Sequence, residues 1–324
     1  MIKGIYTSRY KGGVIAAPDY SQQELRVISG LSNCQSLLEA YRNGEDVHMK
    51  TAMSVFKKPK EEITKNERRF CKSATFAILY GSTVPGLANL MSVPIEQAQQ
   101  MMDGFFNAYP ELKIWMDARH AEIDRGQKVS CSKVGYFLDI DSNGYGGIEE
   151  AYKQAGNYPV QGQSSLIAGY VLNSINQYFV DNNMMTKPIS FIHDSLEFDI
   201  HPSELFAACQ KITGMMNEIP NSEFGIPSKA ELTIGMSMGD ENEVIYLEET
   251  KDGGIIELQG YENDLDAMLE NWRSVYSKVE YTDDPDSIEE VYVPRKEIFM
   301  PKLTISKYSG TLRKMLKRRF SIVT

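Results

Sequence analysis

Residues 188–200 read PISFIHDSLEFDI, and this stretch decides the fold. Two short runs rich in β-branched and aromatic residues flank the polar triplet 193–195, which is typical of antiparallel strands joined by a tight turn. A second apolar run at 14–17 predicts another strand, and the carboxylate of Asp19 follows at its end. If the two strands are neighbours in one sheet, Asp19 and Asp194 converge on one site. Taken singly, each also fits a plain role, Asp19 as a solvated helix cap and Asp194 as a turn residue.

Helical signals fill most of the remaining chain. Thr64 and Glu67 form a capping box near the start of a helix predicted over 61–79. Further helices are predicted over 95–125, 164–182 and 202–217, and strands over 128–140 and 229–240. The order of strand, helices, hairpin, helix and strand predicts an α+β fold with an antiparallel sheet.

Composition excludes several classes of protein. No run of about 18 apolar residues is present, which argues against a membrane partner. The four cysteines have no paired spacing, so neither a zinc cluster nor a disulfide framework is indicated, and a cytoplasmic location is expected. The net charge of −10 argues weakly against nucleic acid, but it decides little because basic residues gather at 65–72 and 307–319.

The predicted helix over 61–79 carries a specific pattern of side chains. Arg68, Lys72, Phe76 and Tyr80 recur every four residues, so they form one stripe about 18 Å long. Two cations suit a triphosphate, and two aromatic rings suit a base. A solvated basic helix start is the alternative.

These segments closely resemble the three polymerase motifs of family A DNA polymerases. The matching segments are DYSQQELR at 19–26, RRFCKSATFAILYG at 68–81 and IHDS at 192–195, in the family's order. The resemblance extends to GEDVH at 44–48 and NYPVQG at 157–162, and it covers about residues 5–242. It implies a palm whose antiparallel sheet carries the metal site, with a helical fingers subdomain.

The resemblance implies template-directed transfer of a deoxynucleotide from a dNTP to a primer 3′-OH. Asp19, Asp194 and the Tyr20 carbonyl are the expected ligands of two Mg²⁺ ions, with Mn²⁺ as a possible substitute. Such a pair of ions stabilises both oxygens of an in-line phosphoryl transfer. The catalytic residues are expected to be Asp19, Asp194 and Lys72, the last as a candidate proton donor to pyrophosphate.

The resemblance also implies which residues bind the nucleotide and which contact the DNA. Arg68 and Lys72 correspond to residues that grip the phosphates, Phe76 and Tyr80 to residues near the sugar and the templating pair, and Glu24 to the steric gate against a ribose 2′-OH. Residues expected to line the primer terminus, the template or the minor groove are Arg26, Lys153, Asn157, Gln161 and His193; His193 is also counted with the nucleotide-binding residues.

Three departures from the family bear on these assignments. Ser195 stands where the family usually has Glu, with Glu197 two residues on, and His-Asp-Ser is instead typical of phage-type single-subunit RNA polymerases. A fragment of such an RNA polymerase is therefore the nearest competing enzyme, although DYSQQELR favours DNA. Lys153 replaces a frequent Arg, and SKVGY at 132–136 replaces a Gly-Arg-Arg stretch. A catalytically silent DNA-binding subunit is the other alternative.

The predicted organisation has four parts. Residues 1–50 and 131–242 form the palm, 51–130 the helical fingers, and 243–324 an appendage of unknown role. Only 18 residues precede Asp19, so we expect a split or truncated polymerase, phage-encoded and in the cytoplasm of a bacterial host. A second chain would supply the thumb and the 3′–5′ exonuclease. Trp272 and the basic end LRKMLKRRF are candidates for docking that chain or DNA, or belong to a solvated tail.

Overall fold

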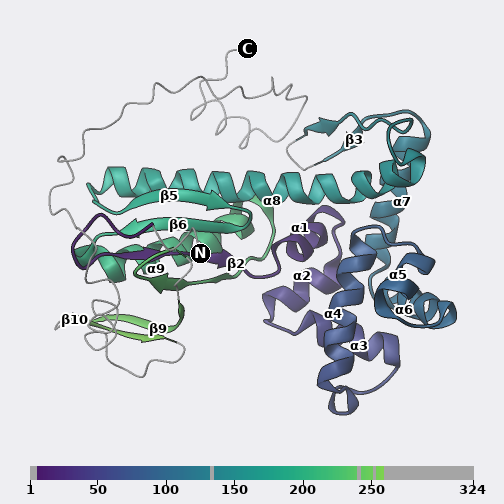
Figure 1. Cartoon of the computed structure of the whole chain (residues 1–324), viewed down its shortest axis with the longest axis horizontal. Coiled ribbons are helices and arrows are strands. Elements are labelled where there is room, and N and C mark those ends of the chain that lie inside the picture. The colour runs from purple at the N-terminus through teal and green to yellow at the C-terminus, as the bar shows by residue number, and fades with distance from the viewer. Residues whose placement is uncertain (1–5, 132–134, 239–241, 251–252, 259–324) are drawn as a thin grey trace. The chain divides into compact units, whose positions relative to one another are not determined.

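The computed structural model describes residues 6–131, 135–238, 242–250 and 253–258 (Figure 1). Trp272 and the basic end of the chain lie outside these residues. The described residues form two compact units. The sheet unit comprises residues 6–23 and those from 165 onward, and the helical unit comprises residues 24–164. The boundaries predicted between palm, fingers and appendage stay a prediction.

The sheet unit is organised around the hairpin predicted from the sequence. Strands β5 (Lys187–Ile192) and β6 (Ser195–Ile200) are joined by a turn at His193 and Asp194. His193 has a φ of 59°, the left-handed conformation that two-residue hairpin turns favour at their first position. Alternate residues of β6, Leu196, Phe198 and Ile200, are fully buried, so one face of this strand belongs to the core.

The other strands add to β6 in an antiparallel sheet. Two short strands, β1 (Val14–Ala16) and β2 (Asp19–Tyr20), both pair with β6. The remaining strands are β7 (Ala230–Glu231), β8 (Thr233–Gly235), β9 (Asn242–Thr250) and β10 (Gly253–Leu258). The order is β10-β9-β8-β1-β6-β2-β7, with β5 on β6. Strand β9, which lies in the segment predicted to be an appendage, pairs with β8.

Helices complete the sheet unit. The long helix α8 (Gly147–Asp181) contributes its second half, where the Phe179 ring packs edge-on against Phe198 of β6 at 6.1 Å. Helix α9 (Leu205–Phe224) follows the short 3-10 turn η3 (Pro202–Glu204) and ends at Gly225 with a φ of 68°. The predicted α+β class is confirmed.

The helical unit consists mainly of short helices. They are α1 (Gln23–Leu31), α2 (Gln35–Arg42), α3 (Val47–Phe56), η2 (Lys60–Glu62), α4 (Lys65–Leu79), α5 (Val84–Met91), α6 (Ile95–Ala108) and α7 (Pro110–Asp124). A two-stranded sheet, β3 (Val129–Ser130) with β4 (Phe137–Leu138), precedes α8. No helix among the described residues is long and apolar enough to cross a membrane.

Helix α4 confirms the predicted capping box. The Thr64 hydroxyl accepts from the Glu67 backbone N–H at 3.1 Å, and the Glu67 carboxylate accepts from the Thr64 N–H at 2.8 Å. The helix therefore begins after Thr64 rather than at 61. Its buried face carries Cys71, Ala74 and Ile78.

Candidate functional site

The sheet unit brings Asp19 and Asp194 together. Asp19 is the first residue of β2, and its cross-strand partner in β6 is Ser195, the residue directly after Asp194. When Asp19 is protonated, its carboxyl group can donate a hydrogen bond to Asp194. The convergence expected from two strand ends is thus present within one sheet.

The pair has a shifted protonation equilibrium. Neighbouring protein atoms strip part of the hydration from the Asp19 carboxylate, although the residue stays exposed, and this raises its pKa. The negative charge of Asp194 and the hydrogen bond donated to Asp194 raise the pKa further, and Glu231 adds a smaller effect. Together they bring the pKa of Asp19 to about 6. Two carboxylates this close favour sharing a cation or a proton.

The donors fit a hard divalent cation. Mg²⁺ prefers carboxylate oxygens, and it is usually held by one or two carboxylates while it keeps several waters. Among the described residues, no group of three or more His, Cys, Asp or Glu side chains could hold a metal. The two aspartates therefore suit a cation that takes its other ligands from water and substrate. The Tyr20 carbonyl stays a predicted ligand, and the Tyr20 side chain is buried.

Ser195 lies between this pair and a buried carboxylate. Its hydroxyl oxygen is 3.4 Å from Glu197 Oε1 and 3.5 Å from the Pro18 carbonyl, both long for hydrogen bonds of a hydroxyl. Glu197 is only 4% exposed. The departure at 195 therefore places a neutral hydroxyl opposite Asp19.

In the helical unit, α4 presents the predicted stripe. On α4, Lys72 is exposed, and Arg68 and Phe76 are partly exposed. Arg68 Nε lies 2.5 Å from Asp46 Oδ2, and both side chains are 39% exposed. These three side chains of the stripe are therefore accessible.

His48 of α3 lies near Phe76 and Lys72 of this stripe, a neighbour that the helical spacing does not predict. The residue is 1% exposed, and neither ring nitrogen has a hydrogen-bond partner among the described residues. Its ring centroid is 6.1 Å from that of Phe76. Burial, together with the positive charge of Lys72, lowers the pKa of His48 to about 4. The signal was its place in the segment GEDVH.

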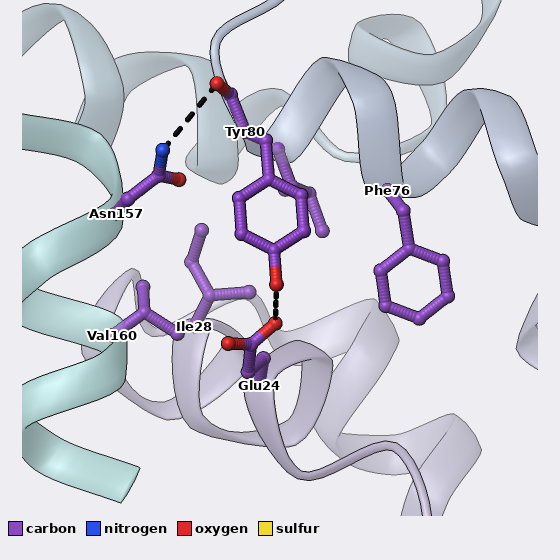
Figure 2. A pocket seen from close by; sticks show the side chains of 7 residues that line it. Glu24, Ile28, Phe76, Tyr80, Asn157 and Val160 are labelled. Atoms are coloured by element: carbon purple, nitrogen blue, oxygen red, sulfur yellow. Dashed lines mark hydrogen bonds between the residues drawn. The ribbon is translucent and has the colours of Figure 1, made fainter. Parts of the chain in front are cut away.

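Glu24, Tyr80 and Asn157 meet at a small pocket (Figure 2). The Tyr80 hydroxyl donates to the Glu24 carboxylate, and Asn157 Nδ2 donates to the Tyr80 carbonyl at 3.4 Å. The rest of the pocket is lined by Ile28, Phe76, Leu79 and Val160. Side chains from α1, α4 and α8 thus fix the ring of Tyr80 and the carboxylate of Glu24.

The other predicted residues are less closely grouped. Arg26 is 7% exposed, and its guanidinium carbon lies 4.1 Å from the Tyr41 ring centroid. Lys153 Nζ is 3.9 Å from Glu150, while Gln161 and His193 are exposed. Their roles toward primer and template stay predictions.

Three comparisons bear on this geometry. The sequence model of "DNA polymerase family A" matches residues 1–240. DNA polymerase I of Streptococcus pneumoniae serotype 4 is 30% identical over 223 residues, which are 67% of this chain and 25% of that protein. The DNA polymerase of Bacillus phage SP01 is 28% identical over 274 residues, 80% of this chain and 30% of that protein.

The fold has a counterpart among solved structures. The POL domain of Pol1 from M. smegmatis, solved in complex with DNA primer-template and dNTP, superposes with a TM-score of 0.65 at 23% identity. The match covers 73% of this chain and 42% of that one. The chain thus spans between a quarter and a third of the length of these two polymerases from sequence comparison.

Proposed function

Because the chain belongs to family A of the DNA polymerases, we propose that it catalyses template-directed DNA synthesis. The primer 3′-oxygen forms a bond to the α-phosphorus of a dNTP, the bond to the bridging oxygen breaks, and pyrophosphate leaves. The observation that carries the proposal is the pairing of β2 with β6, which sets Asp19 beside Asp194.

In the proposed reaction the two aspartates hold the metal ions. When bound, two Mg²⁺ ions, or Mn²⁺ in their place, stabilise the attacking and leaving oxygens. Asp19 and Asp194 supply the carboxylates, and the Tyr20 carbonyl is a further ligand. Partial burial and then the charge of Asp194 raise the pKa of Asp19, and a bound cation would relieve the second of these effects.

The stripe on α4 is proposed to bind the nucleotide. Arg68 and Lys72 would grip the triphosphate, and Lys72 would donate a proton to pyrophosphate as it leaves. Arg68 must then release Asp46; an exposed ion pair of this kind contributes little stability. We add His48, because its buried ring beside Lys72 has no other hydrogen-bond partner among the described residues.

Glu24 and Tyr80 are proposed to select the sugar. The Tyr80 hydroxyl holds the Glu24 carboxylate in place, and a fixed carboxylate in this position would exclude a ribose 2′-OH. Phe76 and Tyr80 would contact the sugar and the templating pair, while Arg26, Lys153, Asn157, Gln161 and His193 would contact the primer and template.

Ser195 favours a second candidate, a fragment of a phage-type RNA polymerase. Primer extension with Mg²⁺ separates the two, using dNTPs and NTPs in parallel and Asp194→Ala as the inactive control. Extension by dNTPs alone supports a DNA polymerase. Extension by NTPs alone would move the assignment to RNA synthesis, and DNA binding without any extension would favour the silent subunit.

A second chain that supplies the thumb and the exonuclease is the remaining part of the proposal. A second chain that adds phosphate contacts should strengthen binding to duplex DNA by orders of magnitude at moderate salt. The extension assay is therefore run with this chain alone and with the product of the neighbouring gene. Full processive synthesis by the purified chain alone would contradict the need for a partner.

A further inference from the structure

Asp19 has two cross-strand neighbours, one on each side. Its partner in β6 is Ser195, and its partner in β7 is Glu231. Directly opposed residues of antiparallel strands point to the same face, with Cβ atoms about 4.5–5.5 Å apart. Residues adjacent to these three, Tyr20, Leu196 and Ala230, are buried. Ser195, Asp19 and Glu231 therefore form a row across the face of the sheet that lies away from the core.

In this row Asp19 and Glu231 carry like charges directly opposite each other, which does not stabilise the sheet. Like charges directly opposite each other destabilise a strand pair. Asp194 already adds a second carboxylate beside Asp19, and the negative charge of Glu231 also acts on Asp19. On the other flank Ser195 carries no charge. The negative charge that a carboxylate at 195 would supply is thus supplied from β7 instead.

We propose that Glu231 is an outer carboxylate of the cation site formed by Asp19 and Asp194, where it holds a water of the bound ion and does not ligate the ion itself. This inference rests on the proposed function, since it concerns the same site. Glu231 Oε1 now lies 3.5 Å from Lys229 Nζ, with side chains 46% and 65% exposed. Exposed ion pairs of this kind are weak. Glu231 exchanges Lys229 for one of the cation's waters, and this contact strengthens binding.

Direct Mn²⁺ binding tests the role without relying on catalysis. The free Mn²⁺ signal is followed by electron paramagnetic resonance while the metal is titrated into the full chain, without DNA or nucleotide. Glu231→Gln keeps the shape and removes the charge, and it should weaken Mn²⁺ binding roughly 10-fold. Glu223→Gln, an exposed position on α9, is the matched loss of charge and should change nothing.

A rescue variant separates a charge effect from damage to the sheet. Adding Ser195→Glu to Glu231→Gln returns a carboxylate to the other flank of Asp19, so it should restore most of the affinity. Circular dichroism melting checks that each variant is folded.

The outcomes distinguish this inference from the proposed function. If the wild type binds no Mn²⁺, or Asp194→Ala binds it equally well, the metal site itself is wrong and the inference falls with it. If Asp194→Ala loses binding but Glu231→Gln binds like the wild type, only the role of Glu231 is refuted. Weakened binding in Glu231→Gln that Ser195→Glu fails to restore would also refute it, because the loss would not follow the charge.

Discussion

Because Asp19 and Asp194 interact as like charges, Asp194 should lower the stability of the metal-free protein. We expect Asp194→Asn to raise the free energy of unfolding at pH 7.5 while it abolishes synthesis. Two unit charges about 4 Å apart repel by about 1 kcal/mol in water and by about 4 kcal/mol at an effective dielectric constant near 20. Asp19 is exposed, so the lower value applies. The expected gain is therefore about 1 kcal/mol.

The gain should depend on pH in a defined direction. Burial and the neighbouring Asp194 raise the pKa of Asp19 to about 6 in the folded chain, above its ordinary value of 3.8. The folded state thus binds this proton more tightly than the unfolded state, so the cost is absent below pH 3.8 and is complete once the pH exceeds about 6. The advantage of Asp194→Asn should be full at pH 7.5 and reduced at pH 5.

The free energy of unfolding of wild type and variant is measured at both pH values by urea titration, with circular dichroism as the signal and EDTA present to remove metal. Mg²⁺ should then stabilise the wild type but not the variant, because a ligand that binds only the folded state raises its stability. A variant that is less stable at pH 7.5, or equally changed at pH 5 and 7.5, would refute the argument that the two carboxylates repel each other.

Three further substitutions follow from the helical unit. Glu24→Ala should increase incorporation of ribonucleotides relative to deoxynucleotides by at least about 10-fold, an effect of about 1.4 kcal/mol. Competition assays with ribonucleotides and deoxynucleotides check this. Unchanged selectivity would exclude Glu24 as a steric gate. His48→Gln should raise KM for dNTP roughly 10-fold with a smaller change in kcat, if His48 binds the triphosphate in ground and transition states alike; a kcat effect alone would argue for a different role. Gly81→Ala should lower stability by about 1 kcal/mol, because Gly81 has a φ of +77° and an added Cβ would lie 3.0 Å from Lys153 Cγ and 3.3 Å from Lys153 Cα. Gly126→Ala, at a φ of +62° with nothing within 4 Å, separates backbone strain from that contact in thermal melts.

Local signals in the sequence predicted the parts of the fold that local chemistry controls. The hairpin at 188–200 and the cap at Thr64 were found because turn residues and capping side chains act on their neighbours in the chain. The stripe on α4 was found for the same reason, since helical spacing alone sets which side chains share a face.

Helix α8 shows why other parts were missed. It was expected to begin at 164, yet it begins at Gly147 and continues through Pro159 and Gly162. Glycine and proline lower helix propensity, and tertiary packing overrides that preference. At Gly162 a Cβ would collide with the Tyr136 hydroxyl, so the glycine is required by a close approach that the local sequence cannot reveal.

Long-range register explains the rest. Nothing near Glu231 in the sequence indicates that it lies opposite Asp19, because strand register is set by pairing between distant segments. The burial of His48 beside Lys72 likewise depends on how α3 packs against α4. The residue pattern gave the aspartates and the α4 stripe and the resemblance to family A gave their expected roles, whereas Glu231 and His48 came from the structure.

The most direct test of the account is incorporation of a single nucleotide opposite each of four templating bases. The chain is assayed with Mg²⁺, alone and with its proposed partner chain, beside the folded variant Asp194→Asn. We predict that only the complementary dNTP extends the primer and that the variant yields no product. Extension that ignores the template, equal extension by the variant, or no extension in either mixture would contradict the claim that Asp19 and Asp194 form a polymerase active site.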